Sequence, residues 1–519
     1  MTNPFSDIIW SKVASQFAYN SQEPLIFSSG LFLFLFLAFA SVYVGLKRKD
    51  TLRILFVTLF SYYFYYKSSG LYFCLLAFVT LSDFFIGKKI HTLISAECRA
   101  NICEPFSEDN TNLPSDGKSK AKWFVALSVI IDLCLLGYFK YTNFFAGMIA
   151  PIFTNNFQPW DIFLPVGISF FTFQSLSYTI DIYRGKIKPL DSLMDYAFFV
   201  SFFPQLVAGP IVRAADFIPQ IRKPLIVNQQ MFSEGVFLII SGLFKKAVIS
   251  DYISVNFVER VFDRPELYSG LENLLATYGY TLQIYCDFSG YSDMAIGIAL
   301  LLGFRFPINF NSPYKSESPT EFWRRWHISL SSWLKDYLYI SLGGNRKGKI
   351  RQYINLIITM LLGGLWHGAS LNFIVWGGLH GVALAIDKKK NELLHRPKKY
   401  HPTGWKRILE VFITFHFVAL CWIFFRNSTF ENSWVMLKMI FTNLQPQILF
   451  EWITSYSGVA MLMVLGYVLH FLPEKFTEWT KSKVSSTNIF VQALLVILVI
   501  FIVIQVKSSD IQPFIYFQF

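Results

Sequence analysis

The sequence predicts an all-α integral membrane protein, and its composition and its pattern of apolar runs are the main reasons. Of the 519 residues, 53% are hydrophobic and only 15% are charged, whereas a soluble globular chain carries roughly 25% charged residues. The chain also contains 56 Phe, 26 Tyr and 13 Trp. A single water-soluble core cannot bury so much apolar surface, so part of it must face lipid. This composition excludes a secreted globular enzyme, a disordered chain and a nucleic-acid-binding protein.

Apolar runs recur along the whole chain and predict roughly 11–13 membrane helices, some of them re-entrant. The first run, Leu25–Leu46, is long enough to span a bilayer. The polar residues 1–23 before it do not fit a cleavable signal peptide. Because we find no internal repeat and no Gly/Ser-rich linker, we expect a single transmembrane domain over residues 1–519. The runs lie near residues 25–46, 54–66, 71–87, 123–150, 162–182, 194–212, 232–250, 272–303, 353–368, 371–387, 408–425, 452–472 and 488–506.

The net charge of +12 sits in short loops between the apolar runs. Positively charged loops tend to stay in the cytoplasm. The basic loops at residues 47–53, 346–351, 388–407 and 473–487 therefore predict that both chain ends lie outside. We expect a multi-pass protein in a lipid bilayer with an extracytoplasmic C-terminus.

Several common catalytic motifs are absent from the sequence. It contains no G-x-x-x-x-G-K-[ST], no G-x-S-x-G and no H-E-x-x-H, so ATP-driven transport, nucleophile-elbow hydrolysis and zinc-protease chemistry lack their motifs. The six cysteines are scattered and form no C-x-x-C pair. We therefore expect neither a disulfide framework nor a bound metal.

Polar residues are unusually dense between residues 282 and 380. Asp287 and Asp293 lie there in apolar surroundings. Ionisable groups at membrane depth are costly, so they usually face a cavity or pair with another group. Two readings stay open: these carboxylates line a functional channel, or they only cap helices and tie them together.

The segment Ser318–Tyr339 contains the first candidate histidine, His327. Pro319 and Glu321 are typical of a helix start, and the Trp, Arg and Lys residues that follow favour an interfacial or re-entrant helix. His327 is either a functional imidazole or a polar side chain at the level of the lipid headgroups.

The second candidate, His367, lies among glycines and apolar residues. A helix that begins near Arg351 and rises about 1.5 Å per residue places His367 roughly 24 Å along its axis. The chain then returns to the basic run at Lys388, so His367 is expected near the tip of a hairpin. An intramembrane His is a functional-site hypothesis by default, and the alternative is a satisfied core histidine. His380, in the helix that follows, is expected to pack against its neighbours. His416 and His470 are expected to be structural residues, because they lie in spans without polar neighbours.

An imidazole in a water-excluded channel suits acyl transfer to a hydroxyl. Its unperturbed pKa of about 6.5 lets it accept a hydroxyl proton near neutral pH. Acylation from a thioester needs a base, an oxyanion stabiliser and exclusion of water. His367 is the candidate base, and His327 is the candidate to orient or polarise the donor carbonyl. Both roles require the two histidines to converge.

The chain ends in an aromatic segment, Pro513–Phe519. It is either an interfacial anchor or a tail that dips into the protein and presents the Tyr516 hydroxyl. A phenol has a pKa near 10, so its acyl ester stays reactive enough to pass the group on.

Several motifs together resemble the membrane-bound O-acyltransferase (MBOAT) family, and within it the bacterial alginate O-acetyltransferase branch. Their order and number carry the resemblance, which covers about residues 160–385 as the family core. The motifs are Leu164–Gln174, Phe203–Arg213, Gly242–Lys246, the run from Asp287, Arg324–Ser331, Leu342–Arg346 and Leu365–Gly368, ending near Gly381.

The resemblance implies an MBOAT fold with a cytoplasmic funnel for the donor and a central tunnel. The near-universal histidine of the family falls on His367, and the second essential histidine of the branch falls on His327. The tail at residues 514–519 is similar to the aromatic C-terminal motif of the relay peptide in the bacterial D-alanylation system, in which Tyr516 matches the acyl-carrying Tyr. Polar candidates for the channel are Asp287, Asp293, Gln174 and Asn345.

The resemblance thus implies a membrane O-acyltransferase of the bacterial inner membrane. An acetyl group would leave acetyl-CoA, a cytoplasmic thioester, and reach an extracytoplasmic acetyltransferase with a serine nucleophile, which places it on a polysaccharide. Two other classes stay open. One is a transporter or lipid flippase, and the other is a non-catalytic scaffold of an envelope-polysaccharide modification complex.

Overall fold

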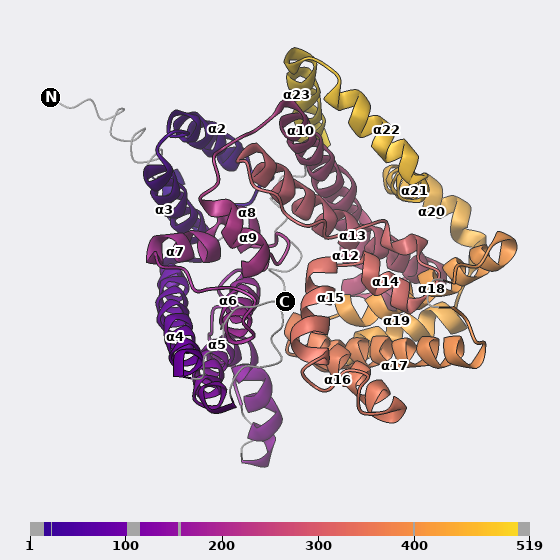
Figure 1. Cartoon of the computed structure of the whole chain (residues 1–519). Coiled ribbons are helices and arrows are strands. Elements are labelled where there is room, and N and C mark those ends of the chain that lie inside the picture. The colour runs from indigo at the N-terminus through magenta and orange to yellow at the C-terminus, as the bar shows by residue number, and fades with distance from the viewer. Residues whose placement is uncertain (1–14, 22, 101–114, 154–156, 398–399, 507–519) are drawn as a thin grey trace. The chain divides into compact units, whose positions relative to one another are not determined.

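The computed structural model is built from helices (Figure 1). It describes residues 15–21, 23–100, 115–153, 157–397 and 400–506, without the side chains of residues 97–100 and 115–118. Within these ranges there is no β-strand. The predicted all-α fold class is confirmed.

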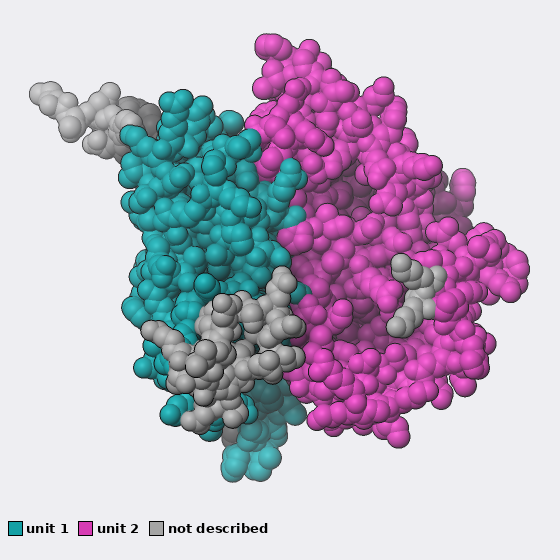
Figure 2. Space-filling model, in the orientation of Figure 1, with its two compact units in different colours: residues 1–226, 302–306 teal, residues 227–301, 307–519 magenta. Residues whose placement is uncertain are grey.

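The chain divides into two compact units (Figure 2). Unit 1 comprises residues 1–226 and 302–306, and unit 2 comprises residues 227–301 and 307–519. The expectation of a single transmembrane domain remains a prediction. The helices of unit 1 are α2 (Gly30–Gly45), α3 (Asp50–Ser69), α4 (Phe73–Ala100), α5 (Ser115–Ile149), α6 (Ile168–Tyr183), α7 (Leu193–Ser201), α8 (Phe203–Leu206) and α9 (Ala214–Ile221).

Aromatic packing forms much of the core of unit 1. The fully buried Phe203 of α8 lies against Phe39 of α2 and Phe60 of α3, with ring centroids 5.5 and 5.1 Å apart. A second cluster joins Phe202 and Phe217 at 5.4 Å. Aromatic pairs of this kind add stability beyond the area they bury.

Unit 2 carries the candidate histidines. A long helix starts as α10 (Gln229–Leu243), continues through the π-helical turn η4 (Phe244–Ser250), the short α11 (Asp251–Ile253) and the π-helical turn η5 (Ser254–Val258), and ends with α12 (Glu259–Asp263). The remaining helices are α13 (Gly270–Leu301), α14 (Pro319–Arg325), α15 (Ile328–Trp333), the π-helical η8 (Leu334–Tyr339), α16 (Lys349–His367), α17 (Leu371–Leu393), α18 (Gly404–Arg426), α19 (Phe430–Thr442), α20 (Leu449–Ser455), α21 (Ser457–Phe471), α22 (Glu474–Ser485) and α23 (Ile489–Val506).

Among the described residues, four helical stretches are long and apolar enough to cross a membrane: 50–96, 119–152, 404–426 and 489–506. The helices of residues 446–455 and 457–471 form a fifth candidate, bent by 101°. This count is lower than the expected number of membrane segments. Some apolar runs form short or broken helices, and the long helices α13, α16 and α17 are not among these candidates. Within Leu25–Leu46 the helix covers only the 16 residues Gly30–Gly45 and begins after the Ser29 cap. It is shorter than the four candidate spans, and its crossing of the membrane stays a prediction.

Helices α10 and α13 run antiparallel and touch through glycines. A Cβ atom on Gly290 would lie 2.6 Å from the carbonyl oxygen of Gly242, and one on Gly297 would lie 2.6 Å from that of Gly235. Both pairs are spaced by seven residues, so they repeat along one helix face. In lipid there is no hydrophobic driving force for helix association, so helices associate through close packing. Small residues allow this packing because they let two backbones approach closely. These contacts fix α13 against α10.

We expect Gly290→Ala to lower the stability of the protein in detergent by about 1–3 kcal/mol, because the new methyl group meets rigid backbone. Gly137→Ala is the matched control, since its Cβ would have no atom within 4 Å. Helix propensity alone makes this control neutral or stabilising by up to about 1 kcal/mol. The melting temperatures of the two variants test the contact, and equal shifts would contradict it.

Candidate active site

The backbone of His327 is strained and held from both sides. His327 caps the start of α15 with φ 43° and ψ 56°, a left-handed conformation that non-glycine residues rarely adopt. The amide of Asn311 donates to the carbonyl of Arg325 at 2.9 Å, and the amide of Ile328 donates to the carbonyl of Asn309 at 2.9 Å. We call these two bonds the backbone clasp. It joins residues 309–311 to residues 325–328 across the strained position.

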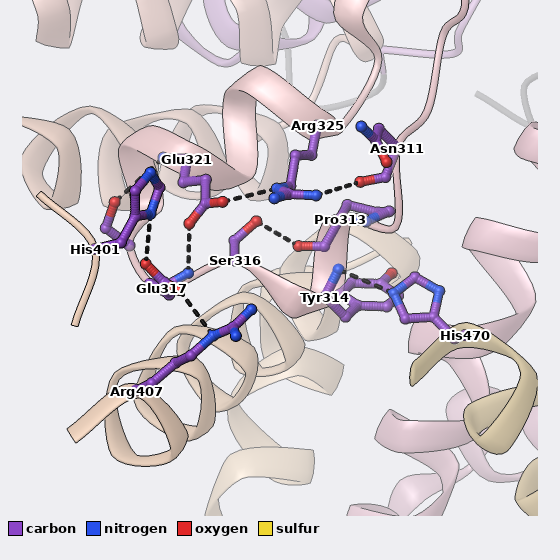
Figure 3. Close-up of polar contacts among 11 residues, drawn as sticks. Asn311, Pro313, Tyr314, Ser316, Glu317, Glu321, Arg325, His401, Arg407 and His470 are labelled. Carbon is purple, nitrogen blue, oxygen red and sulfur yellow. Dashed lines mark hydrogen bonds and ion pairs between the residues drawn. The ribbon is translucent and has the colours of Figure 1, made fainter. Parts of the chain in front are cut away.

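A side-chain network supports the clasp (Figure 3). Arg325 donates to the carbonyl of Asn311 at 3.2 Å and pairs with Glu321 at 2.8 Å. Glu321 lies in the first turn of α14, where the Ser318 hydroxyl accepts a hydrogen bond from its amide and Pro319 is the first residue. The predicted helix start at Pro319 is confirmed.

The network extends to the segment before α18. The carboxylate of Glu317 contacts Nδ1 of His401 at 3.1 Å and Nε of Arg407 at 2.9 Å (Figure 3). Nearby, the amide of Tyr314 donates to Nε2 of His470 at 3.1 Å. The expectation that His470 has no polar company was therefore wrong, and it was also wrong for His416, whose Nε2 lies 2.9 Å from the hydroxyl of Tyr278.

The imidazole of His327 is fully buried. Its Nδ1 lies 3.2 Å from Oδ1 of Asn309, and its ring meets that of Phe288 edge-on at 4.6 Å. Oδ1 of Asn309 also accepts hydrogen bonds from the amide and the hydroxyl of Ser329, while Nδ2 donates to the hydroxyl of Ser292 at 3.2 Å. His327 lies outside the candidate spans, and burial lowers its pKa to about 3. The ring is therefore neutral at pH 7.

His367 is the last residue of α16, and α17 begins at Leu371. The predicted hairpin is confirmed. Its two helices pack closely because a Cβ on Gly364 would collide with the carbonyl of Phe373, and one on Gly377 would collide with that of Met360. The hairpin tip holds a buried imidazole that is 3% exposed.

Aromatic rings surround His367 and link it to His327. The ring of His367 lies 5.2 Å from that of Trp376 and 5.1 Å from that of Phe425. Trp366 contacts both histidines, with centroid distances of 4.8 Å to His367 and 6.2 Å to His327. Both imidazoles thus contact the same indole ring in an interior of low polarity.

The two aspartates of α13 face lysines. Asp287 pairs with Lys246 at 2.5 Å, and Asp293 pairs with Lys245. Lys246 also contacts Asp251 at 2.8 Å. The two lysines sit in the π-helical turn η4, so these ion pairs tie α13 to η4, which favours the tying role over the channel role. The sequence contained a hint of these partners, because two consecutive lysines in an apolar run need carboxylates.

The other predicted site residues lie elsewhere. Gln174 is fully buried in α6 of unit 1, and neither polar atom of its side chain has a hydrogen-bond partner. Asn345 is exposed in the turn before α16, whose first residue, Lys349, lies about 27 Å along the helix axis from His367. Tyr516 lies outside the described residues. Within the part of the chain that the structure describes, no group of three or more His, Cys, Asp and Glu side chains is arranged to hold a metal.

Comparison with known proteins gives consistent matches. The model of the membrane-bound O-acyltransferase family matches residues 16–425. A probable alginate O-acetylase of Pseudomonas aeruginosa is 41% identical over 80% of this chain and 75% of its own length. A peptidoglycan O-acetyltransferase of Helicobacter pylori is 37% identical over 80% and 79%, respectively. A teichoic acid D-alanyltransferase of Bacillus subtilis is 29% identical over 53% and 71%.

The ion pairs at η4 predict which of two substitutions destabilises the protein more. Lys246→Met leaves the buried Asp287 and its neighbour Asp251 without their shared cation, so we expect a loss of roughly 3–5 kcal/mol. Asp287→Asn should cost less, because Lys246 keeps Asp251. The amount of folded protein and its melting temperature in detergent measure both effects. Equal losses, or a milder effect of Lys246→Met, would show that the pairs do not share one cation.

Proposed function

Because the chain belongs to the membrane-bound O-acyltransferase family, we propose that it transfers an acetyl group from a thioester to a hydroxyl, for O-acetylation of an extracytoplasmic polysaccharide. The family match and the polysaccharide O-acetyltransferases among its relatives support this proposal. The more similar relatives are named for acetyl transfer, whereas the D-alanyltransferases match a shorter part of the chain. Acetyl is therefore the favoured acyl group.

The observation that carries the proposal is that both His327 and His367 contact the ring of Trp366. Transfer forms a C–O bond, breaks a C–S bond and moves the hydroxyl proton to the leaving sulfur. A buried imidazole can carry that proton, and aromatic walls exclude the water that would hydrolyse the thioester. The division of roles between the two imidazoles depends on which ring nitrogen carries the proton.

The route of the acetyl group follows from the charged loops. We place the basic loops on the cytoplasmic side of the inner membrane, where acetyl-CoA is the thioester donor. The C-terminus then lies outside, with Tyr516 as a candidate acyl carrier. From there an extracytoplasmic acetyltransferase with a serine nucleophile takes the group to the polysaccharide.

Labelled acetyl-CoA tests the transfer. We expect wild-type protein in liposomes to consume acetyl-CoA and to pass label to a hydroxyl acceptor, and His367→Ala and His327→Ala to lose at least about 100-fold in rate. His395→Asn changes an exposed loop histidine and is the control, with unchanged rate. Unchanged rates in both active-site variants would reject the assignment, and export of label without consumption of acetyl-CoA would favour a flippase.

The transfer of the acetyl group through Tyr516 has its own test. Tyr516→Phe removes one oxygen, so we expect the variant to fold and to consume little acetyl-CoA, with no label on the intact protein. Label that depends on His367 but survives Tyr516→Phe would keep the acyltransferase and reject the tyrosyl intermediate. Intact-protein mass measurement distinguishes these outcomes.

A further inference from the structure

The contacts of Asn309 determine which nitrogen of His327 carries the proton. The backbone amide of Ser329 points at Oδ1 of Asn309 from 3.2 Å. A backbone N–H can only donate, so the atom it meets must be the amide oxygen. If the amide were flipped, its NH₂ group would face this N–H, and two donors cannot bond to each other.

The same oxygen lies 3.2 Å from Nδ1 of His327. An amide oxygen only accepts hydrogen bonds, so Nδ1 must be the donor. A neutral imidazole has one N–H. With that proton on Nδ1, the other nitrogen, Nε2, presents a lone pair.

We infer that Asn309 is a positioning residue that fixes the Nδ1–H tautomer of His327, so that His327 accepts the hydroxyl proton through Nε2 and does not polarise the donor carbonyl. This inference rests on the proposed acyl transfer for its catalytic consequence, and on the contacts of Asn309 for the tautomer. It changes the role expected from the sequence, because polarising a carbonyl requires a proton on Nε2.

The step balances as follows. The acceptor oxygen forms a bond to the acyl carbon while its proton moves to Nε2 of His327. The C–S bond of the thioester breaks, and the imidazolium returns the proton from Nε2 to the leaving sulfur, which gives the ester and a free thiol. Throughout the step, the Nδ1–H group of His327 stays hydrogen-bonded to Oδ1 of Asn309. The developing oxyanion favours the imidazolium beside it, which offsets the effect of burial.

Asn309 is itself fixed in place. Its backbone carbonyl belongs to the clasp, its Nδ2 is held by Ser292 of α13, and its side chain is 1% exposed. One residue therefore holds both the backbone and the ring of the strained His327. Such shared support is what a proton-transferring group needs, since errors of about 1 Å can cost on the order of 100-fold in rate.

The tautomer can be measured without any activity. Full-length protein with ¹⁵N-labelled histidine in lipid nanodiscs gives separate signals for protonated and unprotonated ring nitrogens. The His327 signals are assigned by their loss in His327→Gln or, if that variant does not fold, by magnetisation transfer from ¹³C-labelled asparagine. We expect protonated Nδ1 and bare Nε2 in the wild type. Protonated Nε2 with bare Nδ1 would overturn the inference.

Variants of Asn309 separate positioning from folding. Asn309→Leu has a similar size but no acceptor, so we expect it to lose the fixed tautomer and on the order of 100-fold in transfer rate, with unchanged binding of acetyl-CoA. Asn309→Asp keeps an acceptor and should keep Nδ1 protonated, but its negative charge favours the doubly protonated ring, so we expect a lower transfer rate at neutral pH. An unchanged tautomer in folded Asn309→Leu would overturn the inference.

A buried asparagine elsewhere in unit 2 is the matched control. Asn273 donates to the carbonyls of Pro265, Tyr268 and Ser269 and is fully buried. Asn273→Leu should reduce the amount of folded protein but leave the His327 tautomer and the rate per folded molecule unchanged. A change of the His327 tautomer in this control would mean that the change in Asn309→Leu reflects a general loss of packing in unit 2 and not the loss of the Asn309 acceptor. A last outcome separates the two proposals. If neither the wild type nor any variant transfers acetyl groups, but the wild type shows Nδ1 protonated and Asn309→Leu loses this preference, the proposed function fails and the tautomer assignment stands.

Discussion

The candidate site depends on keeping His327 in a left-handed backbone conformation inside an apolar interior. Such a conformation costs a non-glycine residue of order 1–3 kcal/mol, so the surrounding structure must impose it. The backbone clasp does so with one hydrogen bond on each side of the residue. Glycine would remove the strain, but it would also remove the imidazole. The strained backbone is therefore explained by the need for an imidazole side chain at position 327.

Helix α13 connects this strained turn to the rest of unit 2. Its glycines fit against α10, its aspartates pair with the lysines of η4, and its Phe288 and Ser292 contact His327 and Asn309. The ion pairs neutralise charges that would otherwise be costly at membrane depth. Because one helix makes all these contacts, a shift of α13 would move the histidine pocket as well. Stability and site geometry are therefore coupled in this unit.

The sequence predicted those features that local pattern determines. The α16–α17 hairpin with His367 at its tip and the start of α14 at Pro319 both follow from nearby residues. The burial of His327 does not, because the sequence also allowed a position at the lipid headgroups. The convergence of His327 and His367 on Trp366 was not predictable, because it depends on contacts between distant segments. The lysine partners of Asp287 and Asp293 were missed for the same reason. Asn309 was missed because it lies in a loop between α13 and α14 without helical periodicity, and its role follows only from the bond to a ring that is 18 positions away.

An amide suits the support of His327 better than a carboxylate would. A carboxylate holds Nδ1–H as well as an amide does, but in a closed apolar pocket it adds a negative charge that the neutral imidazole cannot balance. The pocket would then favour a permanently protonated ring, which has no lone pair to receive a proton. The amide of Asn309 orients the ring without adding charge, so the imidazole stays neutral until charge develops on the reacting oxygen. The choice of a neutral partner thus follows from placing acid–base chemistry where water is excluded.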